Sequence, residues 1–170
     1  MNQPFFFGPH GETVWSTAFA SFLPLLAAYV EAERDLEDIS HSHDPALSLW
    51  QRDRDAAEVR LAQAIVSLHR LPVRIPEDRP LQRLVALLYR MLDDHEPDAP
   101  RQLHREMKAT FFRHYQVRGI GPNAQHRNML LIQARHLVDA MITLSFFDYL
   151  PEEAVPEPDL EDQRLLVDAV

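Results

Sequence analysis

The 170-residue sequence contains no cysteine and only four glycines. Without cysteine the chain forms no disulfide, no thiolate zinc site and no cysteine nucleophile. It also lacks the glycine-rich phosphate loops of P-loop and dinucleotide-binding proteins, and no Gly-x-Ser-x-Gly motif occurs. These absences remove the common signatures of hydrolases and nucleotide-dependent enzymes. The sequence therefore predicts no cofactor and indicates no particular reaction.

Long apolar runs are also missing. The longest candidate for the roughly 18 residues of a membrane span, residues 129–150, is interrupted by Arg135, His136 and Asp139. The N-terminal residues lack the basic region of a signal peptide. We therefore expect a soluble, cytoplasmic protein that does not bind a membrane.

What the sequence does contain is helical periodicity. Residues that are apolar apart from Arg54 recur at alternating spacings of three and four along residues 15–39 and 47–71, a pattern typical of helices that pack along one face. The connection Ser40–Asp44 is short, so these two helices should be antiparallel neighbours. No strand pattern occurs. The predicted fold is all-α, a four- or five-helix bundle built on a long antiparallel helical hairpin. Three further helices are expected: one over about residues 81–94, one that follows Asp98 and Pro100 with Leu103, Met107, Phe111 and Tyr115 on one face, and one over about residues 123–150.

Several details of this bundle follow from residue types. Pro24 should kink or split the first helix, and the helix over 123–150 should be the central one because it is apolar nearly all round. We expect residues 1–150 to form a single domain. Residues 151–170 are rich in acids and proline, which predicts a disordered tail. The predicted core contains Phe22, Tyr29, Leu47, Leu61, Leu68, Leu88, Phe111, Leu137 and Met141.

Charge is distributed unevenly along the chain. The formal net charge is −9, yet residues 101–138 carry seven Lys or Arg residues against the single acid Glu106. Such an excess indicates an anionic partner for one surface, provided that the basic residues share a face. These residues are Arg101, Arg105, Lys108, Arg113, Arg118, Arg127 and Arg135.

The segment Gly119-Ile120-Gly121 is the most distinctive motif. It resembles the turn of helix-hairpin-helix DNA-binding modules, in which a Gly-hydrophobic-Gly turn lies between two helices. That resemblance implies that backbone amides of the turn hold a DNA phosphate. Ala124 stands one position earlier than the alanine of that family, and the following helix is longer than the module needs. The candidate anion- or nucleic-acid-binding residues are Arg113, Arg118, Gly119, Gly121, His126 and Arg127.

A second interpretation of this loop is purely structural, and we favour it. Gly119 would terminate the preceding helix, and Gly121 with Pro122 would begin the next one.

The aromatic residues near this loop also have two interpretations. Phe111, Phe112 and Tyr115 can stack on single-stranded bases beside arginines, but Phe111 and Tyr115 fit the core face of a helix, which leaves Phe112 unassigned.

Two clusters of histidines and acids, at residues 35–44 and 93–96, carry side chains that can bind a metal. Both are predicted at helix ends, where polar residues accumulate, and the sequence has no Glu-x-x-His pair of a di-iron bundle. We therefore predict no metal site.

Arg135, His136 and Asp139 form a polar cluster on the last helix, because their spacing of up to four residues allows them to meet. We interpret them as a polar stripe that fixes helix register, with an acid–base site as the alternative.

These patterns favour a non-catalytic helical interaction or regulatory protein that binds another protein. The alternative is a nucleic-acid-binding protein that uses a basic surface from residues 101–135 and the Gly119-Ile120-Gly121 loop. An enzyme ranks third, because no catalytic constellation occurs. Long apolar stripes, with Trp15 and Trp50 near opposite ends, also predict a homodimer.

Overall fold

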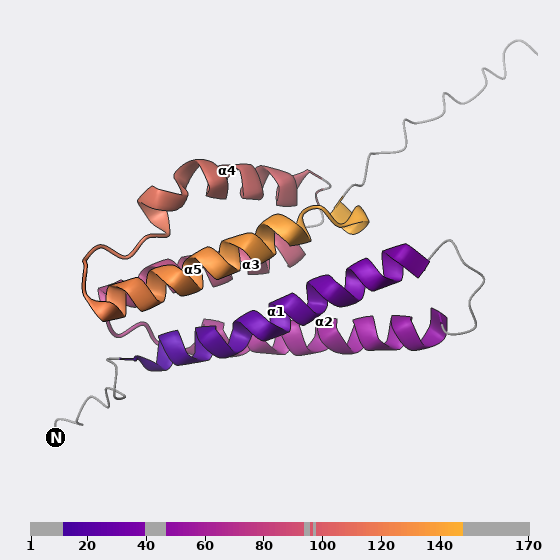
Figure 1. Cartoon of the computed structure of the whole chain (residues 1–170), viewed down its shortest axis with the longest axis horizontal. Helices are drawn as coiled ribbons and strands as arrows, with labels where there is room; N and C mark the ends of the chain where they lie inside the picture. Colours follow the sequence, from indigo (N-terminus) through magenta and orange to yellow (C-terminus); the bar gives the residue numbers. More distant parts are fainter. Residues whose placement is uncertain (1–11, 40–46, 94–95, 97, 148–170) are drawn as a thin grey trace, which may run out of the picture.

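The structure is a computed structural model that describes residues 12–39, 47–93, 96 and 98–147. Over these residues the chain forms five α-helices, two short 3₁₀ turns and no strand (Figure 1). The fold is all-α, as predicted. In chain order the elements are α1 (Val14–Ile39), α2 (Leu47–Arg70), η1 (Pro76–Asp78), α3 (Arg79–Asp93), α4 (Ala99–His114), α5 (Pro122–Met141) and η2 (Ser145–Phe147).

The helices α1 and α2 form the predicted antiparallel hairpin and contact each other more extensively than any other pair. The two helices lie side by side, and the end of the hairpin extends beyond α3 and α5 (Figure 1). Of the two expected effects of Pro24, a kink or a split, the split does not occur, because α1 continues through Pro24 as one element. The Nε1 group of Trp15 donates a hydrogen bond of 3.2 Å to the carbonyl oxygen of Leu71, which ties the start of α1 to the end of α2.

The central helix is α3, not α5, which corrects the prediction. The helix α3 contacts all four other helices, and its Leu81, Leu84 and Leu88 are fully buried. In contrast, α5 exposes half of Met129 and 46% of Ile132. The sequence of α5 is apolar on most sides, but its main packing is on α1 and α3, and the side that carries Met129 and Ile132 stays exposed.

The last helix also ends earlier than predicted. It stops at Met141, because the chain turns at Ile142 and Thr143, where the Thr143 hydroxyl and amide both donate to the carbonyl oxygen of Ala140. This turn returns Leu144 and Phe147 to the core, where both are buried. Residues 148–170, including the predicted acidic tail, lie outside the described residues.

Apolar side chains from all five helices form one core. Seven of the nine predicted core residues are buried, and Leu137 packs against the core while partly exposed. Leu47 is half-buried, and Trp50 on the same stripe is 37% exposed. Both lie in the first turns of α2, where the hairpin extends past α3 and α5 and only α1 is alongside (Figure 1).

Within the described helices, one segment is long and apolar enough to cross a membrane, Val14–Glu37 of α1. The Phe19, Phe22 and Leu26 side chains of this segment are buried in the bundle. Buried core helices meet the same criterion of length and composition, so packing against α2 and α5 accounts for the apolar character of α1.

Candidate functional site

Arg127, one of the predicted anion-binding residues, lies inside the protein. Its side chain is 3% exposed, and its Nε donates to Asp78 Oδ1 over 2.8 Å. Thr13 donates its hydroxyl to the same Asp78 oxygen over 3.0 Å, and Arg127 Nη1 donates to the Asn123 carbonyl over 3.2 Å. The charge of Arg127 is therefore matched within the fold, and the network ties α5 to η1 and to the residue that precedes α1.

The connection between α4 and α5 contains both glycines of the predicted loop. The helix α4 ends at His114, with Tyr115 as its C-cap, so Gly119 does not terminate it. Gly119 has a φ of +126°, a conformation that other residues adopt only with strain. Gly121 is the N-cap residue of α5 and Pro122 occupies its first turn, as the structural interpretation predicted.

Asn128 fixes this connection against α5 in a way that the sequence did not reveal. Its Oδ1 accepts a hydrogen bond of 2.8 Å from the Val117 amide, and its Nδ2 donates one of 3.0 Å to the Val117 carbonyl. Both polar backbone groups of the buried Val117 are thereby satisfied.

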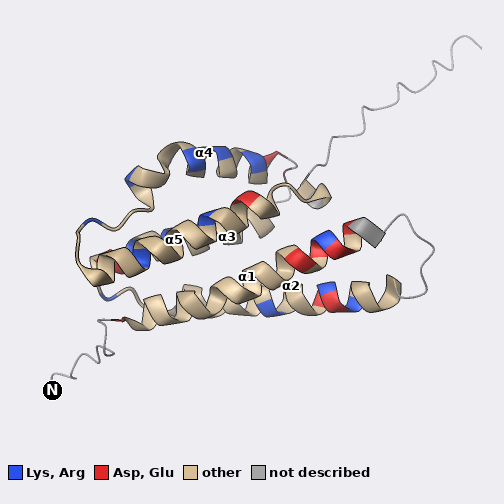
Figure 2. Ribbon diagram, in the orientation of Figure 1, with Lys and Arg blue, Asp and Glu red and all other residues tan. Residues whose placement is uncertain are grey.

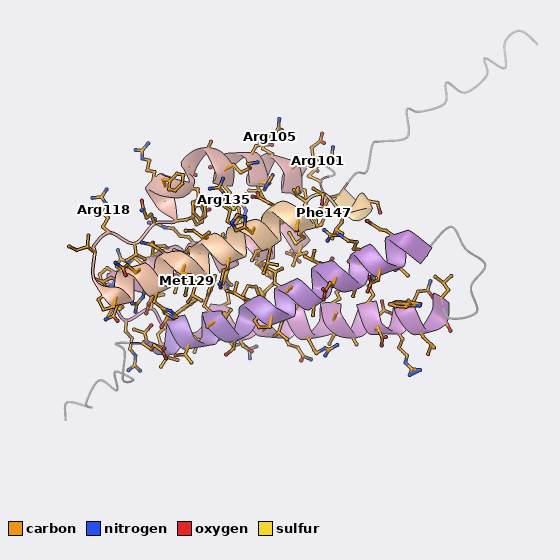
Figure 3. The ribbon with its side chains drawn as sticks, viewed as in Figure 1. Arg101, Arg105, Arg118, Met129, Arg135 and Phe147 are labelled. Atoms are coloured by element: carbon orange, nitrogen blue, oxygen red, sulfur yellow. The ribbon has the colours of Figure 1, made fainter. Side chains whose placement is uncertain are left out.

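The other predicted anion-binding side chains lie nearer the surface. Arg113 and Arg118 are exposed and His126 is half-buried. Arg118 projects from the connection (Figure 3).

Four side chains on α4 form a basic stripe with an aromatic end. Arg101, Arg105, Lys108 and Phe112 are spaced by four, three and four residues, which places them along one face of the helix. The buried core residues of α4 lie on a different face. Arg105 and Lys108 are exposed, and Phe112 is 71% exposed. Basic residues follow α4 in Figure 2, and Arg101 and Arg105 lie along it in Figure 3. We call these four residues the α4 stripe.

The polar cluster predicted on α5 reaches across to α4. Asp139 Oδ1 lies 2.6 Å from His104 Nε2, and its other oxygen lies 3.9 Å from Arg135 Nε. The Arg135 guanidinium stands 4.8 Å from the ring centre of Phe111 and 5.9 Å from that of Phe112. His136, the third predicted member, is exposed. The partner of Asp139 is thus a histidine 35 positions earlier in the chain, which helix spacing alone does not indicate.

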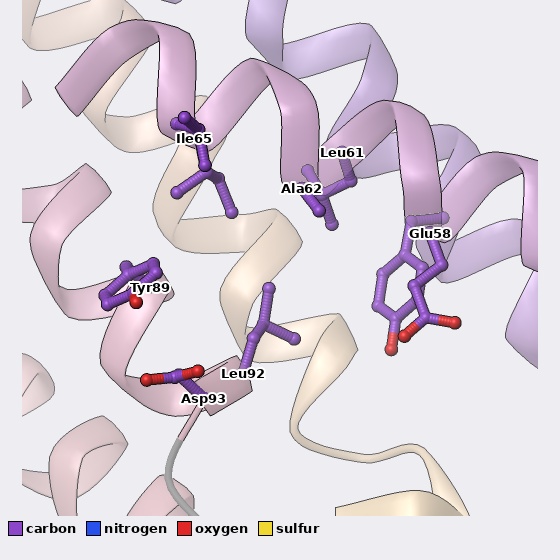
Figure 4. Close-up of a pocket in the computed structure, with 9 residues that line it drawn as sticks. Glu58, Leu61, Ala62, Ile65, Tyr89, Leu92 and Asp93 are labelled. Carbon is purple, nitrogen blue, oxygen red and sulfur yellow. The ribbon is translucent and has the colours of Figure 1, made fainter. Parts of the chain in front are cut away.

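A groove between α2 and α3 is the second candidate surface. It encloses about 190 Å³ between Leu61, Ala62 and Ile65 of α2 and Leu92 of α3. Figure 4 shows these side chains with Tyr89 nearby. Val59, Val66 and Tyr89 along these two helices are 54%, 40% and 42% exposed. We call this surface the α2–α3 groove, and its apolar character is typical of sites that bind an apolar side chain.

Two carboxylates stand at the α2–α3 groove, one on each wall. Glu58 belongs to α2 and Asp93 to α3, and both are exposed. Glu58 also lies 3.2 Å from Arg54, whose Nε is 2.9 Å from the buried Glu33 of α1. The groove therefore combines an apolar floor with negative charge at its walls.

Tyr29 of α1 lines the inner side of the groove. Burial, followed by the charge of Glu33 and a hydrogen bond to it, raises the pKa of Tyr29 above its ordinary value. The phenol therefore stays protonated and donates to Glu33, which makes it a fixed polar group rather than a base.

At the surface of α2 and α3, the ring centre of His69 lies 5.7 Å from the ring centre of Tyr89, and this contact helps to position Tyr89.

Among the residues that the structure describes, no three histidines or acids gather to form a metal site. The histidines of the two predicted clusters, His41, His43 and His95, lie outside these residues. We take the α4 stripe and the α2–α3 groove as the candidate surfaces. No protein-family model, curated protein or solved structure matches this chain.

Proposed function

We propose that this protein is a non-catalytic helical interaction protein that binds another protein through the α2–α3 groove. The supporting observation is the groove itself, an apolar cavity of about 190 Å³ on the exposed side of α2 and α3. A cavity of roughly 150 Å³ lined by apolar side chains is large enough to hold a benzene ring, so the groove has room for one large apolar side chain. Such a pocket is typical of an anchor in helix-in-groove recognition.

The charges at the groove specify the chemistry of the partner. Glu58 and Asp93 would face a bound segment from both walls, and carboxylates favour basic side chains in that segment. Val66 lines the groove, and the exposed Val59 lies two helical turns before it on α2, where a longer bound helix would contact it. The proposed partner is therefore an amphipathic helix that carries an apolar anchor flanked by lysine or arginine.

A synthetic amphipathic helical peptide of leucine and lysine should bind the full-length protein, whereas its leucine–glutamate counterpart should not. Tyr89→Ser and Val66→Ser should each weaken binding about tenfold, because each removes apolar contact at the groove, and tenfold corresponds to about 1.4 kcal/mol. Fluorescence anisotropy of the labelled peptide measures the dissociation constant for each variant. The matched control is Ile132→Ser on α5, which is exposed to a similar extent. Equal peptide affinities for Tyr89→Ser, Val66→Ser and Ile132→Ser would show that the peptide does not bind in the α2–α3 groove.

The α4 stripe favours a second candidate function, nucleic-acid binding. Arg101, Arg105 and Lys108 share one face of α4, and Phe112 at the end of the stripe offers a ring for stacking. Basic side chains beside an exposed aromatic are typical of single-strand-binding surfaces. The overall charge of −9 opposes this function, because distant acids repel phosphate. This surface would not use Arg127, which is buried and paired.

If the α4 stripe binds nucleic acid, a labelled single-stranded oligonucleotide should bind at low salt and dissociate as salt rises. The double variant Arg105→Ala/Lys108→Ala should lower the slope of log affinity against log salt by about 1.4, which is about 0.7 for each phosphate that the protein no longer neutralises. Arg52→Ala/Arg60→Ala on α2 removes the same charge from exposed positions elsewhere and is the control. Absence of binding at low salt, or an equal effect of both double variants, would exclude this function.

A further inference from the structure

The two candidate surfaces of this protein are complementary to each other. The α4 stripe is a basic helical face with an exposed phenylalanine at its end, and the α2–α3 groove is an apolar cavity with a carboxylate on each wall. The stripe therefore has the features that the proposed function assigns to the partner of the groove. The α4 stripe and the α2–α3 groove belong to different faces of one chain, so they can meet only between two copies.

Phe112 matches the anchor that the groove would take. Its ring is 71% exposed and leans edge-on against Phe111, at 5.7 Å between ring centres. The cavity of about 190 Å³ exceeds the roughly 150 Å³ that holds a benzene ring, so a phenylalanine ring fits it in size. Insertion would cover Phe112 on one copy and Val66 with Tyr89 on the other, removing exposed apolar surface on both.

The charges next to the anchor are also opposite in sign. Lys108 precedes Phe112 by one helical turn, and Arg105 by two. Neither side chain has an ion-pair partner among the described residues. Glu58 and Asp93 line the groove that the ring would enter, and both are exposed, so they attract these cations, although Glu58 also pairs with Arg54.

We propose that the protein associates with itself head to tail, with Phe112 of one copy in the α2–α3 groove of the next. Because the two contacting surfaces differ, the interface is heterologous, and association continues beyond two copies unless the contacts close. The inference rests on the groove of the proposed function, with a second copy of this chain as its partner. This head-to-tail contact is a different interface from a homodimer in which two copies would pair at the exposed Trp50 end of the hairpin.

The test uses full-length protein and complementary variants. The mass of the wild-type protein, measured by sedimentation, should rise with concentration from the 19.7 kDa of a single chain. Phe112→Ser removes the anchor and Tyr89→Ser weakens the groove about tenfold, so each variant alone should stay mostly a single chain at protein concentrations near the wild-type dissociation constant. Mixed in equal amounts they should form a complex of two chains, because the first variant keeps its groove and the second keeps its anchor. Circular dichroism should show the wild-type helical spectrum for both variants, and Trp50→Ser should associate as the wild type does.

Other outcomes overturn the proposal in distinguishable ways. If the wild-type protein stays a single chain at every concentration, the groove does not take a second copy. The leucine–lysine peptide then still reports whether it takes another protein. If Trp50→Ser alone abolishes association, the end of the hairpin is the interface. If both single variants fail to associate and their mixture does not recover, the contact is not between the α4 stripe and the α2–α3 groove.

Discussion

Arg127→Ala should lower the free energy of unfolding by about 3–5 kcal/mol, because it leaves the carboxylate of Asp78 buried without its charge partner. Asp78 and Arg127 are 2% and 3% exposed in their side chains and 2.8 Å apart. For a chain of this size, each kcal/mol corresponds to about 2–4 °C in the melting temperature. Thermal unfolding followed by circular dichroism should therefore show a fall of roughly 6–20 °C.

The control for this prediction is Arg118→Ala, which removes the same side chain from an exposed position. It should change stability by no more than about 0.5 kcal/mol. A second check replaces both partners at once, as Asp78→Leu with Arg127→Met. Because no unpaired charge remains in the interior, this double variant should recover most of the loss. Equal melting temperatures for Arg127→Ala and Arg118→Ala would show that the Arg127–Asp78 pair does not stabilise the fold.

Leu88→Ala in α3 should have the second large effect, a loss of about 3–5 kcal/mol. The leucine is fully buried in the helix that contacts all four others, so the surrounding side chains have little freedom to close the cavity. Urea unfolding should show a lower midpoint with an unchanged slope.

Leu49→Ala is the matched control, since it makes the same substitution on α2 at a position that is 56% exposed. It should change the free energy of unfolding by less than about 0.5 kcal/mol. If the two leucine variants unfold at the same urea concentration, the packing of α3 described above is wrong.

The candidate site could be predicted from the sequence only in part. The excess of arginine over residues 101–135 was visible in composition, but composition does not show which side chains are covered. The structure separates them into the α4 stripe, the exposed Arg113 and Arg118, the partly covered Arg135 beside Asp139, and the buried Arg127. The α2–α3 groove had no sequence signal, because its walls come from two helices and its lining residues are ordinary apolar side chains.

Local periodicity determined the fold class, the hairpin and the helix starts to within a residue or two. Helical hydrogen bonds and apolar stripes depend on residues three or four positions apart, so the sequence by itself carries that information. Tertiary structure alone decided that α3 is central, that α5 ends at Met141 and that Arg127 pairs with Asp78, 49 positions away. Burial and charge pairing depend on neighbours brought together by packing, and no local pattern records which neighbours those are.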